Sequence, residues 1–365
     1  MSTQKILADT VNRLFTDLVT QDVRESAEKG QWPAALWQAV EESGLTLAQI
    51  PEAHGGGGGS WQDAHVVVSA AGRFAAPLPI AETMAAAWLL AEAGLDVPMG
   101  PLTLAPVHLG DRLQIARDGA RFKLTGTATR VPWGRAAKHV VVAVQTDDRS
   151  GGSAGAISGP PQTVTIALVA AGTAKVEPDT NLALEPRDTL SWTGAPVITA
   201  APAGSKLPAK APWLYGALVR SAQMAGGLEY LLAQTVKYVS ERKQFGRPLS
   251  AFQAIQQNLA ILAGHTAAAG IAGATAFRAA DRGDPSFEVA VAKVRTGEAS
   301  GLGAGIAHQC HGAIGFTYEH SLHFVTRRLW SWRAEFGAEP YWSAEIGREV
   351  AARGAGALWP HVTAR

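Results

Sequence analysis

The sequence predicts a mostly helical α+β protein, in which a helical N-terminal domain, a central antiparallel β-domain and a C-terminal helical bundle follow one another. Residues 1–100 and 206–365 place apolar side chains at helical spacing, whereas residues 101–205 carry alternating and β-branched runs between polar turns. The 365 residues are enough for two or three domains with a substantial core. We therefore expect domain boundaries near residues 100 and 205.

The N-terminal region reads as helices separated by turns. Leu36 and Val40 recur at helical spacing, and Gly44 ends their pattern. Residues 55–59 are five glycines in a row. Because no strand precedes them and no Lys-Ser/Thr pair follows, they predict a flexible turn rather than a phosphate-binding loop. Helical spacing resumes in two runs within residues 64–93.

The middle of the chain changes to the pattern of strands. Residues 121–125 alternate between polar and apolar side chains, and residues 139–144 and 163–169 are rich in β-branched residues. Clusters of Gly, Pro, Asp and Ser, as in residues 147–153, separate these runs. Short strands without intervening helices are typical of an antiparallel sheet or a small barrel.

The C-terminal region carries three long helical runs. The first apolar stripe runs from Leu218 to Val239 and the second from Phe252 to Leu262, while residues 288–307 are rich in Ala, Val and Gly. Apolar stripes of this width must be covered, so we expect the helices to pack as a bundle.

Composition excludes several classes of protein. The 32 Lys and Arg residues nearly balance the 31 Asp and Glu residues, so no charge excess favours nucleic acid or an anionic membrane surface. A single cysteine, Cys310, excludes an internal disulfide and fits a reducing cytoplasm. We see neither a signal peptide in the N-terminal residues nor an apolar run long enough to span a bilayer. A cytoplasmic protein is the expectation.

The segment from Tyr238 to Leu249 combines charges with an aromatic ring. Arg242 and Arg247 flank Phe245 where one apolar helix ends and another begins. Cations and glycine are common at a helix C-terminus, which accounts for the charges alone. Two guanidinium groups around an aromatic ring would also suit a planar anionic ligand such as a dinucleotide. Spacing leaves both interpretations open.

Residues 309–316, Gln-Cys-His-Gly-Ala-Ile-Gly-Phe, form a second notable stretch. Gly312 and Gly315 follow a helix rich in small residues, where they would end the helix or let the backbone approach a ligand. Four histidines lie within sixteen positions, at 308, 311, 320 and 323. No paired cysteine or carboxylate pattern completes a zinc site, so we expect no metal.

Candidate catalytic groups are sparse. Glu335 lies among bulky apolar residues, which can raise the basicity of a carboxylate and make it a general base, although it would equally suit a surface position. The sequence contains no GxSxG elbow, Cys-His pair or Walker motif, so nothing supports a hydrolase or phosphotransferase.

Together these segments resemble the acyl-CoA dehydrogenase family over nearly the whole chain. Four stretches carry the resemblance in order: residues 45–56, residues 118–126, Ser240–Gly246 with residues 252–255, and Gln309–Phe316. The motifs ERKxFG and QxxGxxGF are specific when they occur together at this separation. The resemblance implies an N-terminal helical domain, a central β-domain and a C-terminal four-helix bundle.

The resemblance also implies a cofactor, FAD, held between subunits. Arg242 and Phe245 would meet it from a neighbouring subunit, and Gln253 would add a contact. The stretch Gln309, Cys310, His311, Gly312 and Ala313 would lie along the FAD diphosphate. The implied reaction is α,β-dehydrogenation of an acyl-CoA thioester, in which a carboxylate removes the α-proton and an electron-transfer flavoprotein accepts the electrons.

Several family features are missing. The catalytic glutamate of many members, 27 residues after the glutamine of QxxGxxGF, aligns with Phe336, and the alternative position used by others falls near Gly216. Glu335 is one residue early, and we take it as the first candidate base with Glu319 as the second. The TEPxAGSD motif is also missing, and Thr103–Pro106 stands in its neighbourhood.

These losses are similar to those of the shorter subunits of bacterial heteromeric acyl-CoA dehydrogenases, including enzymes of steroid side-chain degradation. The chain would then work in a heterotetramer with a longer acyl-CoA dehydrogenase subunit, and a homodimer or homotetramer stays open. A second hypothesis is a catalytically silent partner that completes another chain's FAD site.

Overall fold

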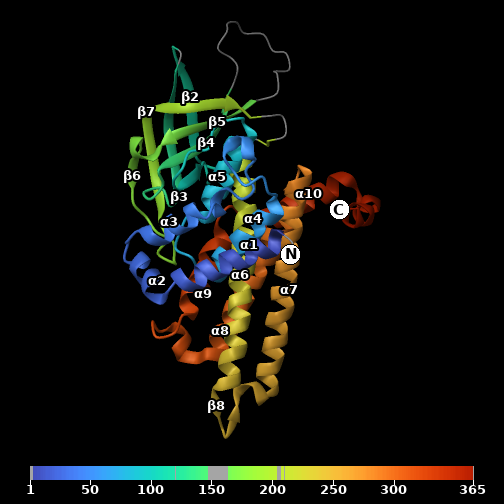
Figure 1. The fold of residues 1–365 in the computed structure, drawn as a ribbon. Helices are drawn as coiled ribbons and strands as arrows, with labels where there is room; N and C mark the ends of the chain where they lie inside the picture. The colour runs from blue at the N-terminus through green and yellow to red at the C-terminus, as the bar shows by residue number, and fades with distance from the viewer. Residues whose placement is uncertain (1–2, 120, 147–162, 204–206, 209, 365) are drawn as a thin grey trace.

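The computed structural model describes residues 3–119, 121–146, 163–203, 207–208 and 210–364. Five helices form the N-terminal region, the strands of the main sheet lie between Leu102 and Pro202, and long helices follow (Figure 1). The predicted order of helical domain, β-domain and helical bundle is confirmed. The polar cluster predicted at residues 147–153 lies outside the described residues.

The N-terminal helices are α1 (Thr3–Leu18), α2 (Gln21–Glu28), α3 (Ala34–Glu42), α4 (Trp61–Arg73) and α5 (Ile80–Glu92). Helix α4 begins with a capping box, in which the Ser60 hydroxyl accepts from the backbone of Asp63 and the Asp63 carboxylate accepts from the backbone of Ser60. Helix α5 is buried almost all round, including Glu82, and packs against β1 and the bundle. The five-glycine run forms the turn before α4, as predicted.

The central sheet has the strand order β1-β4-β5-β7-β3-β2, with β6 added beside β7. Its strands are β1 (Leu102–Ala105), β2 (Arg112–Asp118), β3 (Arg121–Pro132), β4 (His139–Thr146), β5 (Thr163–Ala170), β6 (Lys175–Glu177) and β7 (Arg187–Pro202). Strand β7 is long enough to pair with β3 through one half and with β5 through the other. The β1–β4 pair is parallel, which differs from the predicted antiparallel pattern, whereas the other described pairs of this sheet are antiparallel.

The C-terminal helices are α6 (Ala211–Glu241), α7 (Gln253–Arg282), α8 (Ser286–His311), α9 (Leu322–Ala334), α10 (Glu339–Arg353) and α11 (Leu358–Thr363). Helices α6, α7, α8 and α9 form the bundle, and α10 packs on α8 (Figure 1). A short hairpin, β8 (Lys243–Gln244) with β9 (Arg247–Pro248), projects from the end of the bundle remote from the sheet (Figure 1).

Two glycines allow the N-terminal region to pack closely on the bundle. A Cβ atom on Gly72 of α4 would lie 2.0 Å from the carbonyl oxygen of Gln223, and one on Gly226 of α6 would lie 1.9 Å from that of Ser69. Only glycine allows two helix backbones to approach this closely. The crossing therefore fixes α6 against the N-terminal helices.

Helix α7 is less covered than its apolar sequence predicts. The predicted stripe itself is covered, with Leu262 buried and its other members half-buried, whereas Ile261 and Ile271 outside the stripe are 48% and 70% exposed. By length and composition alone α7 could cross a bilayer, which corrects the expectation that no apolar run is long enough. Its most apolar 18-residue window has a mean hydropathy of 1.4 and is 28% buried. One or two such helices are weak evidence for a membrane span, because helices of soluble proteins also meet these criteria.

Candidate functional site

The residues proposed to hold the cofactor gather at the end of the bundle that carries the hairpin. Arg242 caps α6, Phe245 lies in the β8–β9 turn, Gln253 begins α7, and α8 ends at His311. The Tyr238 hydroxyl donates to the His311 carbonyl oxygen at 3.3 Å, which joins the ends of α6 and α8. We call this group the clasp: Arg242, Phe245, Gln253, Gln309, Cys310, His311, Gly312 and Ala313.

The clasp presents both side chains and backbone to solvent. Arg242, Gln253, Gln309 and Ala313 are exposed, and Phe245 is 92% exposed with a positive φ of 52°. The Arg242 side chain makes no hydrogen bond or ion pair with any residue that the structure describes. Gly312 has a φ of 65° and open space around it. A free guanidinium and open backbone suit a diphosphate, and an exposed ring suits a planar base, so these residues fit a dinucleotide such as FAD.

Two members of the clasp do not offer their side chains. Cys310 is 4% exposed, and burial raises the pKa of its thiol. The His311 ring is also buried, stacks on Tyr238 with 4.4 Å between ring centroids, and has its Nδ1 2.7 Å from the Ala307 carbonyl oxygen. These residues would therefore contribute to a ligand through their backbone only.

The four histidines pack against aromatic rings and against each other. His308 stacks on Phe316 with centroids 4.0 Å apart, and His311 meets His320 edge to face at 4.8 Å. Desolvation by burial lowers the pKa of all four imidazoles below the ordinary value. Within the described part of the chain, no group of three or more His, Cys, Asp or Glu residues could hold a metal ion.

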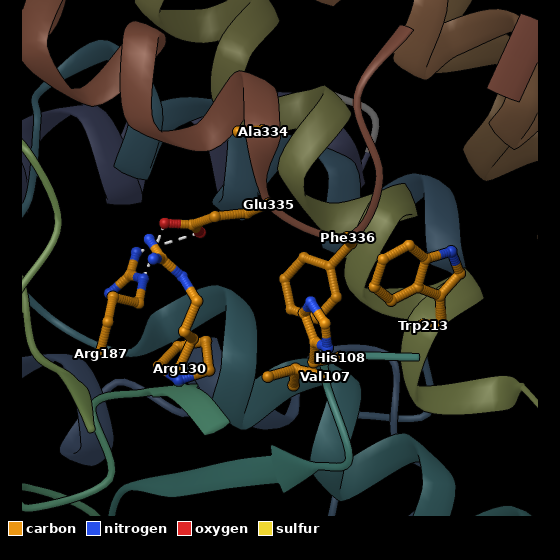
Figure 2. A pocket seen from close by; sticks show the side chains of 9 residues that line it. Val107, His108, Arg130, Arg187, Trp213, Ala334, Glu335 and Phe336 are labelled. Carbon is orange, nitrogen blue, oxygen red and sulfur yellow. Dashed lines mark hydrogen bonds and ion pairs between the residues drawn. The ribbon is translucent and has the colours of Figure 1, made fainter. Parts of the chain in front are cut away.

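Glu335 lies at the edge of a pocket of about 350 Å³ between the sheet and the bundle. We call this cavity the Glu335 pocket; its other walls are Val107, His108, Arg130, Pro132, Arg187, Trp213, Ala334 and Phe336. Figure 2 shows the two arginines on one side of the pocket and the three rings of Phe336, His108 and Trp213 on the other. Glu319, the second candidate base, is exposed and does not line this pocket.

The Glu335 carboxylate is held by three side chains. Arg187 donates to Oε1 from Nε at 2.7 Å and to Oε2 from Nη2 at 3.1 Å, and Arg220 donates to Oε2 from Nε at 2.7 Å. The Asn181 amide adds a hydrogen bond to Oε1 at 3.1 Å. Burial alone would raise the pKa of this carboxyl, but the two guanidinium groups outweigh burial and hold the pKa well below its ordinary value. Such a carboxylate is a weak base.

The arginines that hold Glu335 belong to a larger network of ion pairs that joins all three regions of the chain. Arg220 of α6 also pairs with Glu82 of α5, and Arg187 of β7 pairs with Glu185 at 2.9 Å. Arg328 of α9 reaches the other oxygen of Glu185 at 3.0 Å. Three carboxylates and three guanidinium groups therefore neutralise one another in a buried network.

Lys293 supports the turn that carries Glu335. Its Nζ donates to the carbonyl oxygens of Trp332, Arg333 and Glu335, at 3.2, 3.3 and 2.8 Å. These carbonyls lie in the last turn of α9 and just beyond it, where carbonyls lack the full set of helix partners, although that of Trp332 also accepts from the Glu335 backbone at 3.2 Å. Lys293 is 1% exposed, and desolvation lowers its pKa to about 7.

The two positions at which family members would carry the catalytic acid lie against each other. Phe336 is 3% exposed and takes a φ of 52°. A Cβ atom on Gly216 would lie 2.2 Å from Cε1 of Phe336. The phenyl ring therefore occupies the space that a side chain at Gly216 would need, and the described walls of the pocket contain no carboxylate besides Glu335.

Most of the network was not predicted. Arg220 is 1% exposed although it lies on the face of α6 opposite the predicted stripe, and the signal was that it is the single charged residue between Leu214 and Leu228. An arginine among core positions is rarely buried without a partner, so it predicts a buried carboxylate nearby. Its partners Glu82 and Glu335 lie 138 and 115 residues away, which spacing cannot reveal.

Comparison with known proteins agrees with this architecture. The acyl-CoA dehydrogenase N-terminal domain matches residues 1–96, and the acyl-CoA dehydrogenase C-terminal domain matches residues 210–350. The chain belongs to the acyl-CoA dehydrogenase family, whose members are oxidoreductases with a flavin cofactor.

Several mycobacterial acyl-CoA dehydrogenases are similar to most of this chain. IpdE2 of Mycobacterium tuberculosis is 29% identical over 308 residues, which are 80% of each protein. FadE34 of the same organism is also 29% identical, over 89% of this chain but 44% of its own length. The ChsE4-ChsE5 complex from Mycobacterium tuberculosis contains a chain with a TM-score of 0.85 and 25% identity, covering 97% of this chain and 99% of that one.

Proposed function

We propose that this chain is one subunit of a heteromeric, FAD-dependent acyl-CoA dehydrogenase, in which it holds the cofactor and a longer partner subunit supplies the catalytic base. The assembled enzyme carries out α,β-dehydrogenation of an acyl-CoA thioester and passes the electrons to an electron-transfer flavoprotein. The observation that carries the proposal is the lack of a free carboxylate among the described residues of the Glu335 pocket.

Glu335 serves the fold rather than the reaction in this proposal. A general base must accept a proton at working pH, and its pKa must lie near that pH. The ion pairs of Glu335 with Arg187 and Arg220 lower its pKa instead. Protonating this carboxylate would leave two buried guanidinium groups short of negative charge. Glu319 is exposed and outside the pocket, so it offers no alternative.

The clasp supports a role across a subunit boundary. Its hairpin lies at the end of the bundle remote from the sheet (Figure 1). The Glu335 pocket is instead lined by residues of the sheet region and of the bundle. A single FAD molecule bound to this chain alone would not reach from the clasp to the Glu335 pocket. The exposed Phe245 and the exposed apolar residues of α7 are also typical of a surface that is buried by another protein chain. A second acyl-CoA dehydrogenase subunit would account for both observations.

Within the assembly, Arg242 would pair with the FAD diphosphate, and the backbone from Gln309 to Ala313 would run beside it. Phe245 would stack on the planar part of the nucleotide, and Gln253 would add a polar contact. FAD supplies the hydride acceptor of the reaction. The ChsE4-ChsE5 structure is a complex of two different proteins, which supports the proposed assembly by analogy.

The test compares the chain alone with the chain co-expressed with a longer acyl-CoA dehydrogenase subunit from the same organism. We expect the co-purified complex to show flavin absorbance that bleaches anaerobically with acyl-CoA, and the single chain to show neither. A single chain that is yellow and bleaches would overturn the proposal and restore a base within this chain.

A matched pair of variants tests the clasp. Arg242→Ala in the complex is expected to reduce bound FAD about tenfold or more at limiting cofactor, because a hydrogen-bonded charge pair contributes roughly 1.5–3 kcal/mol. Arg13→Ala, which removes an exposed arginine of α1, is the control and should leave the FAD content unchanged. Equal FAD content in both variants would contradict the role of Arg242.

A further inference from the structure

The Glu335 pocket is open to a ligand even though it lacks a free base. Its volume of about 350 Å³ falls within the range of small-molecule sites. Val107, Pro132, Trp213 and Phe336 give it apolar and aromatic walls. The Trp213 and Phe336 rings meet edge to face, with centroids 6.3 Å apart, so the aromatic side of the pocket is well packed.

No hydrogen-bond acceptor of Glu335 is left for a ligand cation. Both carboxylate oxygens accept two hydrogen bonds each, from Arg187, Arg220 and Asn181. Arg187 in turn donates to Glu185, Glu335 and the Pro186 carbonyl oxygen. The charges of these residues are therefore balanced within the protein.

Arg130 is the other arginine of the pocket, and its charge is not balanced in this way. It is exposed, and its guanidinium makes no hydrogen bond or ion pair with any residue in the described ranges. Figure 2 shows its side chain beside that of Arg187, across the pocket from the Phe336 ring. The pocket thus carries one uncommitted positive charge that faces an aromatic wall.

The backbone around Arg130 is built to present this side chain. The pairing of β3 with β7 is irregular between Ala128 and Val131, and Arg130 takes a φ of 55°. Asp111 holds the irregularity, because its carboxylate accepts from the Thr129 backbone at 3.1 Å and from the Thr129 hydroxyl at 2.8 Å. A bulge redirects a side chain, and a non-glycine residue at positive φ carries strain that often marks a binding site.

His108 adds a second donor on the aromatic side. Its Nδ1 accepts from the Gly110 backbone at 3.3 Å, which leaves the proton of the neutral ring on Nε2. The uncommitted polar groups of His108 and Arg130 are both donors. A ligand must therefore bring acceptors, and a negative charge to match Arg130.

We propose that the Glu335 pocket binds a small organic carboxylate with a planar apolar body. The carboxylate pairs with the Arg130 guanidinium, whose fork matches its two oxygens, and the apolar body lies against Phe336 and Trp213. The proposal concerns the pocket only and does not depend on the role of the clasp.

The test measures binding of benzoate by isothermal titration calorimetry, with uncharged benzamide as the matched probe. We expect benzoate to bind the purified full-length chain at a ratio of one to one, and benzamide to bind at least tenfold more weakly. Arg130→Gln should weaken benzoate about tenfold or more, as expected for a lost hydrogen bond to a charged group. Arg130→Lys keeps the charge without the fork and should bind with intermediate affinity.

Arg121→Gln is the control, because it removes an exposed arginine from the same strand at a position outside the pocket. It should leave benzoate affinity unchanged, and thermal melting checks that each variant is folded. The proposal is overturned if the wild-type chain does not distinguish benzoate from benzamide, or if the Arg121 and Arg130 variants lose affinity equally. A drop in the FAD content of the complex with Arg130→Gln would show that the pocket holds flavin instead, and would leave the clasp proposal standing.

Discussion

The ring of Phe336 occupies the space directly above Gly216, so that a Cβ atom at position 216 would lie 2.2 Å from its Cε1 atom. Both residues stand where the resemblance predicts a catalytic acid in other members of the family. The phenyl ring at 336 has room only because residue 216 is a glycine. The two positions are therefore coupled through packing.

Gly216→Ala tests this packing. Although alanine favours helix formation, the added methyl group must displace the buried Phe336 ring, and overpacking of a core typically costs about 1–3 kcal/mol. We expect a lower free energy of unfolding in urea. Gly264→Ala, in α7 with open space around position 264, should leave the protein equally or more stable, by up to about 1 kcal/mol. Equal effects of the two substitutions would show that the Phe336 ring moves freely.

Glu335→Gln tests the buried network. The amide keeps the shape of the carboxylate but leaves Arg187 and Arg220 with too little negative charge, which we expect to cost about 3 kcal/mol or more. Glu298→Gln removes half of an exposed pair with Arg295 and should cost less than about 1 kcal/mol. Chemical denaturation near pH 7 measures both variants.

The stability of Glu335→Gln should also depend on pH differently from that of the wild-type protein. Because the pKa of Glu335 is lowered in the folded state, its stabilisation is present above the ordinary pKa of 4.5 and is lost as the pH falls below it. Glu335→Gln cannot lose this contribution and should show a smaller decline in acid. A variant as stable as the wild type at pH 7 would contradict the structural role of Glu335.

Lys293→Met removes the amino group that donates to the carbonyl oxygens at the end of α9, and it tests whether this group titrates near neutral pH. The lowered pKa of about 7, against 10.5 for an ordinary lysine, means that the unfolded chain binds more protons between these values. The stability of the wild-type protein should therefore gain a contribution as the pH rises from about 7 towards 10.5. The methionine variant lacks this contribution, so its stability relative to the wild type should decrease over the same range. A constant difference would show that Lys293 keeps its charge.

His65→Phe addresses an imidazole packed against Phe277, with ring centroids 5.1 Å apart. Burial lowers the pKa of His65 to about 4, below the ordinary 6.5. Its contribution to stability is therefore present above pH 6.5 and is lost as the pH falls towards 4, by up to about 1.4 kcal/mol per pH unit. The phenylalanine variant should show a shallower decline in thermal stability between pH 6.5 and 4. Parallel curves for the two proteins would contradict the burial of this ring.

The sequence predicted the order of the regions because each has its own hydrophobic period. Helical spacing in Leu36 and Val40 and strand alternation in residues 121–125 reflect local geometry that holds in any fold. It also predicted the gathering of the clasp, because Arg242, Phe245 and Gln253 follow one helix end and start the next. Their role in binding FAD stays a prediction.

The ion pairs and the Arg130 bulge could not be predicted in the same way. Arg187 reaches Glu335 over 148 residues, and only the packing of β7 on the turn after α9 brings them together. Register irregularity between Ala128 and Val131 depends on which strands pair, not on the residues of β3 alone. For the same reason, spacing alone left Glu335 equally suited to a general base or a surface position, and its buried ion pairs with Arg187 and Arg220 were not predicted.

Helix α6 is one continuous rod of 31 residues that carries Gly216 near one end and Arg242 at the other. At 1.5 Å per residue, about 39 Å of uninterrupted helix separates the two positions. The helix therefore fixes both the distance and the relative orientation of the Glu335 pocket and the part of the clasp that follows α6, Arg242 and Phe245. Deleting a single residue between Gly227 and Tyr238 would shorten the span by only about 1.5 Å, but it would turn Arg242 by about 100° relative to Gly216 and so away from the clasp residues at the end of α8.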